Sequence, residues 1–111
     1  MGLKRKSDVK PESRQLTGTA VLEIIRGELP RLRREYDVRS IGLFGSYAKG
    51  TQRAKSDVDI LVEYETTPGM LKYLELESDL SELLGRKVDL VLKKALKPSI
   101  GERILQEVRN A

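Results

Sequence analysis

Two short apolar runs, each carrying an aspartate, constrain the fold of this chain more than any other feature of its sequence. The runs read VDILVEY at residues 58–64 and KVDLVL at residues 87–92. Short runs rich in Val, Ile and Leu are typical of β-strands, and alternation places Val58, Ile60 and Val62 on one face of the first. The sequence therefore predicts two strands, the first with one apolar face and one face that carries polar side chains.

The aspartates of these runs predict a cation site. Asp57 and Asp59 are two residues apart, so on a strand their carboxylates project from the same face and repel each other unless a cation lies between them. Asp89 interrupts the second run, where an ionised carboxylate inside a buried strand is unfavourable without a partner. If the two strands are neighbours, the three carboxylates can bind Mg²⁺ together with phosphates, which suits two-metal transfer. A solvated strand edge is the alternative for the pair alone.

Helical spacing of apolar residues surrounds these runs. The first helix is expected to have Thr19 as its N-cap and to kink or restart at Pro30, because proline removes a backbone hydrogen bond. Further helices are expected over residues 70–84 and 99–110, and a strand followed by a short helix precedes the aspartate pair. The order is α-β-(short α)-β-α-β-α, which predicts a small sheet with helices packed against it.

The apolar faces of the two later helices have two interpretations. We interpret both as core faces, and docking of a partner is the alternative. The residues that form them are Leu71, Leu74, Leu80, Leu83 and Leu84 in one helix, and Ile100, Ile104, Leu105 and Val108 in the other.

The composition excludes several kinds of chemistry. The 111 residues contain no Cys and no His, which excludes disulfides, thiolate nucleophiles, ordinary zinc sites and a histidine base. No apolar run approaches the roughly 20 residues needed to span a bilayer, and no signal peptide is recognisable. We therefore expect one soluble, cytoplasmic domain with no membrane partner, and a chain this short is compatible with an oligomer or a hetero-complex.

The positive charge is concentrated at the N-terminus. The net charge is +4, and residues 1–16 carry five basic and two acidic side chains. Residues 1–17 are therefore interpreted as a flexible basic extension and residues 18–111 as the folded domain. The domain itself has little net charge, and the chain has no Trp and one Phe to stack on bases, so the sequence does not favour direct nucleic-acid binding.

A glycine-serine turn precedes the aspartate pair. The segment GSYAKGT at residues 45–51 suggests a phosphate-binding loop, but Gly50 is not followed by the Lys-Ser/Thr of a P-loop. Gly45 still allows a sharp turn after a strand, and Ser46 offers a hydroxyl and an N–H to a phosphate. An ordinary strand-to-helix turn is the alternative.

Taken together, these motifs resemble a known family. GSYAKGTQRAKSDVD matches the signature Gly-Ser, ten residues, Asp-x-Asp of the DNA polymerase β-like nucleotidyltransferases, and KVDLVL matches the strand that carries their third aspartate. Over residues 20–110 the chain is similar to the minimal nucleotidyltransferases, the MNT antitoxins of HEPN/MNT toxin-antitoxin systems. The resemblance implies an α/β (α+β) nucleotidyltransferase fold, with a small mixed β-sheet flanked by helices.

The resemblance also implies residue roles. Gly45 and Ser46 would bind the nucleoside triphosphate, and Asp57 and Asp59 would bind two Mg²⁺ ions. Asp89 would complete the shell of the catalytic metal and help to deprotonate the acceptor hydroxyl.

Lys49 stands where the family often has a basic residue, so the resemblance suggests a phosphate contact, and an exposed lysine without such a role is the alternative. Family members act as antitoxins to HEPN ribonuclease toxins, and some transfer AMP from ATP to a tyrosine of the toxin. The expected function is therefore Mg²⁺-dependent adenylyl transfer to a HEPN-domain toxin. An antitoxin that only binds its partner, and an enzyme acting on a small molecule such as an antibiotic, are the alternatives.

Overall fold

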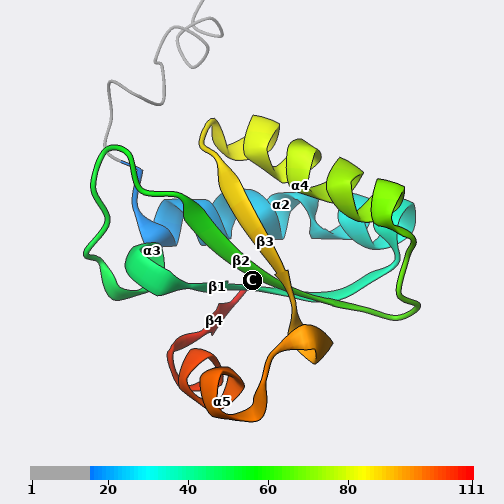
Figure 1. The fold of residues 1–111 in the computed structure, drawn as a ribbon. Helices are drawn as coiled ribbons and strands as arrows, with labels where there is room; N and C mark the ends of the chain where they lie inside the picture. Colours follow the sequence, from blue (N-terminus) through cyan, green and yellow to red (C-terminus); the bar gives the residue numbers. More distant parts are fainter. Residues whose placement is uncertain (1–15) are drawn as a thin grey trace, which may run out of the picture.

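The computed structural model describes residues 16–111, whose strands form one four-stranded mixed sheet (Figure 1). The strand order is β3-β2-β1-β4; β1 is antiparallel to β2 and β4, whereas β3 is parallel to β2. The predicted mixed sheet flanked by helices is confirmed. Most of the predicted extension, residues 1–15, lies outside the described residues. The strands are β1 (Val38–Phe44), β2 (Val58–Tyr64), β3 (Val88–Leu92) and β4 (Arg109–Asn110).

Helices α2 and α4 pack on one face of the sheet, and α5 lies apart from them, beneath the sheet in the view of Figure 1. None of the helices in residues 16–111 has the length and apolar character needed to cross a membrane. The helices are α2 (Gly18–Tyr36), α3 (Gly45–Lys49), α4 (Met70–Leu84) and α5 (Pro98–Glu107), with a short 3₁₀ segment, η2 (Lys93–Ala95), after β3.

Helix α2 differs from the prediction at two points. Its N-cap is Thr17 and not Thr19, because the Thr17 hydroxyl accepts a hydrogen bond from the Ala20 N–H at 3.1 Å. The helix also continues through Pro30 without a restart. Residues on both sides of the proline, including Leu29 and Leu32, are buried in the same core, which holds the two halves in one helix.

The core lies between α2, α4 and one face of the sheet. Val58, Ile60 and Val62 are fully buried there, which confirms the predicted apolar face of β2. In α4 the buried positions are Leu76, Leu80 and Leu84.

Two of the leucines assigned to the core face of α4 are not buried. Leu71 is 73% exposed and Leu74 is 48% exposed. With 3.6 residues per turn, both fall on the side of the helix away from Leu76 and Leu80, so they cannot face the sheet as well. The α4 face that contains them is a solvent face in this chain.

The C-terminal segment also differs from the prediction. Helix α5 ends at Glu107, and residues 109–110 form β4, which pairs with β1 at Gly42 and Leu43. A Cβ atom on Gly42 would lie 2.5 Å from Cγ2 of Val108, so this pairing requires a glycine in β1. The predicted core face of α5 is only partly covered, because Ile100 and Leu105 are about half exposed.

A partly buried ion pair joins α2 to α4. The guanidinium of Arg31 donates two hydrogen bonds to the Asp79 carboxylate, both at 2.9 Å, and the Tyr36 hydroxyl donates a third at 2.7 Å. The bonds from Arg31 hold the pKa of Asp79 below its usual range. This pair fixes α4 against α2, and α4 in turn lies beside β3.

Candidate active site

The turn from β1 into α3 brings the glycine-serine motif against the aspartates. Gly45 has φ of +74°, in the left-handed region that side chains disfavour. A Cβ atom at this position would lie 2.1 Å from Oδ2 of Asp59. Asp59 pairs with Phe44 in the antiparallel register of β1 and β2, which is why the two motifs meet. The glycine is therefore required both by the backbone conformation and by the carboxylate next to it.

The three predicted acidic residues lie at the same end of the sheet. Asp59 and Asp89 are partners in the parallel register of β2 and β3, so both side chains stand on the face opposite the core. Asp57 comes directly before β2 and is exposed. The prediction that Asp89 lies in a buried strand is wrong: its side chain is exposed, because α4 packs on the other face of the sheet.

The carboxylates influence one another. Burial, and then the negative charges of Asp89, Asp57 and Glu107, raise the pKa of Asp59. The site therefore stabilises the protonated form of Asp59 in the absence of a cation, and a cation bound between the carboxylates would reverse this preference.

Glu107, the last residue of α5, belongs to this cluster and was missed by the sequence analysis. Its Oε1 accepts a hydrogen bond from the Gly45 N–H at 3.2 Å, and its Oε2 lies 3.5 Å from Nζ of Lys49. Nothing in the sequence marks it, since it is one glutamate in an amphipathic helix far along the chain from the motif. Only the packing of α5 brings it to the turn.

The basic groups near the site are solvent-exposed. Lys49 is directed toward Glu107, and its side chain is 53% exposed. Lys87 approaches Asp57, with 4.0 Å between Nζ and Oδ2, but its side chain is 79% exposed, so the pair is weak. Ser46 is partly buried in α3, directly after Gly45. Lys49 and Lys87 thus place positive charge at the rim of the site, on exposed side chains.

The donor set fits a hard divalent ion by its chemistry. Within residues 16–111, no group of three or more Asp, Glu, His or Cys side chains is arranged so that it could hold a metal ion. The carboxylate oxygens of Asp57, Asp59 and Asp89 are nevertheless the ligand type that Mg²⁺ prefers. Asp57 and Asp89 are exposed, and the negative charges of both help to raise the pKa of Asp59.

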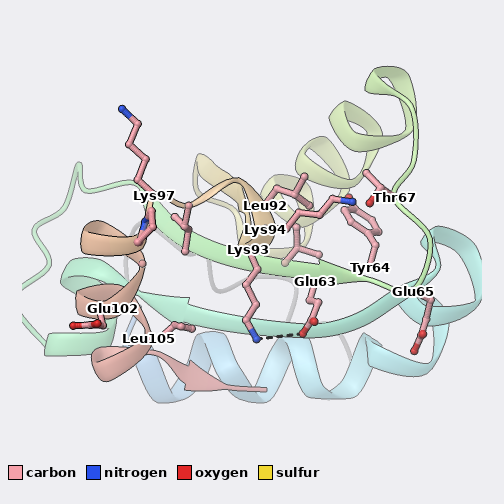
Figure 2. A pocket seen from close by; sticks show the side chains of 14 residues that line it. Glu63, Tyr64, Glu65, Thr67, Leu92, Lys93, Lys94, Lys97, Glu102 and Leu105 are labelled. Carbon is pink, nitrogen blue, oxygen red and sulfur yellow. Dashed lines mark hydrogen bonds and ion pairs between the residues drawn. The ribbon is translucent and has the colours of Figure 1, made fainter.

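A separate cavity of about 490 Å³ lies toward the other end of β2, between η2 and α5 (Figure 2). Its wall includes Glu63, whose Oε1 lies 3.4 Å from Nζ of Lys93. Glu63 shares the open sheet face with Asp59 but lies four residues further along β2, about 13 Å away. The cavity contains none of the predicted site residues.

Known proteins are similar to this chain in sequence and in fold. A family described as nucleotidyltransferase domain matches residues 22–110. The protein adenylyltransferase MntA of Thermococcus cleftensis is 46% identical over 93 residues, which cover 84% of this chain and 94% of the relative.

Two solved structures are also similar. One, provisionally described as a minimal nucleotidyltransferase, has a TM-score of 0.73 and 29% sequence identity. The similar region covers 86% of this chain and 96% of the other chain. The other, described as a toxin-antitoxin with AMP-PNP, has a TM-score of 0.63 and 27% sequence identity. The similar region covers 86% of this chain and 72% of the other chain.

Proposed function

This chain belongs to the nucleotidyltransferase domain family, and from that membership we propose that it is a Mg²⁺-dependent protein adenylyltransferase. It transfers AMP from ATP to a tyrosine hydroxyl of a partner HEPN ribonuclease toxin and so acts as an antitoxin. The name of the Thermococcus relative supports adenylyl transfer to a protein, and the similarity to a toxin-antitoxin structure with AMP-PNP supports a toxin partner and a nucleotide substrate. Residues 18–111 form the transferase domain, and the protein acts in the cytoplasm.

One observation carries the proposal: the Gly45 turn packs against Asp59, which is itself the register partner of Asp89. The glycine-serine turn and two of the carboxylates thus lie next to each other at one end of the sheet. Bound Mg²⁺ would neutralise the carboxylates and stabilise the negative charge that develops on the phosphates. Asp57 and Asp59 would hold the ions, and Asp89 would complete the site.

The residues of the chain have separate parts in the transfer. The acceptor oxygen attacks the α-phosphorus, the bond to the leaving pyrophosphate breaks, and Asp89 takes the proton of the acceptor hydroxyl. Gly45, Ser46 and Lys49 bind the triphosphate. Since Glu107 already engages the Gly45 N–H and Lys49, its carboxylate has to move aside when the nucleotide binds.

Isotope labelling tests the proposal. The protein is incubated with Mg²⁺, a HEPN-domain protein from the same cells, and ATP labelled at either the α- or the γ-phosphate. The expected result is α-label on a tyrosine of the HEPN protein, no γ-label, and loss of transfer with EDTA or with Asp59→Asn. Label from neither position, with neutralisation of the toxin retained by the double variant Asp57→Asn and Asp59→Asn, would instead establish an antitoxin that acts by binding alone.

A further inference from the structure

Strand β3, which carries Asp89, is an edge strand of the described sheet. One side of its backbone pairs with β2, and in this register Asp89 lies beside Asp59. The backbone groups on its other side, at Val88 and Leu90, have no neighbouring strand in residues 16–111. An edge of this kind either binds water, pairs with another chain or is covered by side chains.

Helix α4 covers this edge with a row of polar side chains. The Val88 N–H donates a hydrogen bond to Oγ of Ser81 at 3.0 Å, and the Leu90 N–H donates one to Oε2 of Glu77 at 3.0 Å. The carbonyl oxygen of Leu90 accepts a hydrogen bond from the Tyr73 hydroxyl. The outer backbone donors on both sides of Asp89 therefore have partners on α4.

The four-residue spacing of these polar side chains explains how one helix can form hydrogen bonds along the edge of β3. Tyr73, Glu77 and Ser81 are four residues apart, so they form a row along α4, next to the row of buried leucines that fixes the helix on the core. Ser81 also donates to the carbonyl oxygen of Glu77 at 2.9 Å, which orients its hydroxyl oxygen to accept from Val88. The polar row is thus held in place by the packing of its own helix.

We propose that Glu77, with Tyr73 and Ser81, is a positioning residue that holds Asp89 in register opposite Asp59 by securing the outer edge of β3. This rests on the proposed function, in which Asp89 completes the metal site and accepts a proton. Without the acceptor on α4, the edge of a five-residue strand opens more often, and the Asp89 carboxylate moves away from its working position. A displacement of about 1 Å in a reacting group can reduce the rate by about a hundredfold.

Three variants test the proposal. Glu77→Met keeps the length of the side chain but has no oxygen acceptor, whereas Glu77→Gln keeps an acceptor oxygen. Glu82→Met is the matched control, because Glu82 is an exposed residue of the same helix. Amide hydrogen exchange of the metal-free protein, followed by NMR, reports on the strand edge, and the kcat and KM of α-label transfer report on the site.

We expect the Leu90 amide to exchange about tenfold faster in Glu77→Met and to remain close to wild type in Glu77→Gln and Glu82→Met. We expect kcat to fall about tenfold in Glu77→Met alone, with the KM for ATP changed less than about twofold. If Glu77→Met does not fold, Ser81→Ala replaces it, with the Val88 amide as the reporter.

Three results would overturn the inference. Unchanged exchange of the Leu90 amide in Glu77→Met would show that the hydrogen bond does not secure the edge. An equal loss of kcat in Glu77→Gln or in Glu82→Met would show that the acceptor oxygen is not the cause. If Asp89→Asn transfers label at the full rate, Asp89 has no role in the proposed function, and this inference is wrong as well. If Asp89→Asn is inactive, the role of Asp89 stands, and either of the first two results overturns only the positioning role of Glu77.

Discussion

The carboxylate of Asp59 occupies the space that a side chain on Gly45 would need, since a Cβ atom added to Gly45 would lie 2.1 Å from Oδ2 of Asp59. The contact joins the end of β1 to the start of β2, and it places the glycine-serine turn beside the carboxylates. It is the geometric basis of the candidate site, and it has consequences for both folding and activity.

Gly45→Ala tests this contact against a matched control. Gly50 has a similar positive φ of +79°, but a Cβ atom there would meet nothing within 4 Å. Both variants lose about 1–2 kcal/mol of unfolding free energy from the left-handed backbone. Gly45→Ala should lose further unfolding free energy, and also transfer activity, because its methyl group displaces Asp59. Gly50→Ala should show neither of these additional losses. Urea unfolding of both proteins measures the difference, and equal losses would contradict the contact.

Asp59→Asn should separate stability from activity. The pKa of Asp59 is raised in the folded protein, chiefly by burial, so folding favours its protonated form and stability falls as the pH rises through the folded pKa. At neutral pH and without metal, the neutral asparagine avoids this penalty. We expect Asp59→Asn to be more stable than wild type at pH 7 in EDTA, inactive in transfer, and without its stability advantage below about pH 4. Thermal unfolding across this pH range checks the sign.

Glu107→Gln should change the ionisation of Asp59. The negative charge of Glu107 is one of the causes of the raised pKa of Asp59, after burial, Asp89 and Asp57. Neutralising Glu107 therefore lowers the pKa of Asp59, and it also removes the ion pair with Lys49. NMR titration of the Asp59 carboxyl carbon measures the shift. Glu102→Gln, an exposed residue of the same helix, is the control, and an equal shift in both variants would exclude a local effect.

Loss of the Arg31–Asp79 pair should destabilise the fold in a pH-dependent way. Because the pKa of Asp79 is lowered in the folded state, its contribution is present at neutral pH and is lost as the pH falls through the folded pKa. We expect Asp79→Asn to lose about 1–2 kcal/mol at pH 7 and progressively less below pH 4.

The exposed pair Arg39–Glu65, in which both side chains are more than half exposed, supplies the control for this prediction. Glu65→Gln should change the unfolding free energy far less than Asp79→Asn at any pH, because solvent screens an exposed pair. Urea unfolding at several pH values compares the two variants, and a pH-independent loss in Asp79→Asn would mean that packing rather than charge is responsible.

The features that the sequence by itself determined depend mostly on residues that are close together in the chain. The alternation of Val58, Ile60 and Val62 set one buried face, and glycine at position 45 allowed the turn that no other residue makes easily. The spacing of Asp57 and Asp59 predicted two carboxylates that influence each other, and the charge of Asp57 does help to raise the pKa of Asp59. These features depend on local backbone geometry, which a short stretch of sequence specifies.

The tertiary structure decided what depends on distant segments. Glu107 reaches the Gly45 turn only because β4 pairs with β1 and draws the end of α5 to the site. The row of Tyr73, Glu77 and Ser81 lies along β3 because of the side of α4 that packs against the core. The predicted core face of α4 included Leu71 and Leu74, which are exposed in the structure. Periodicity indicates that a helix has an apolar face, but only packing selects the face that is buried.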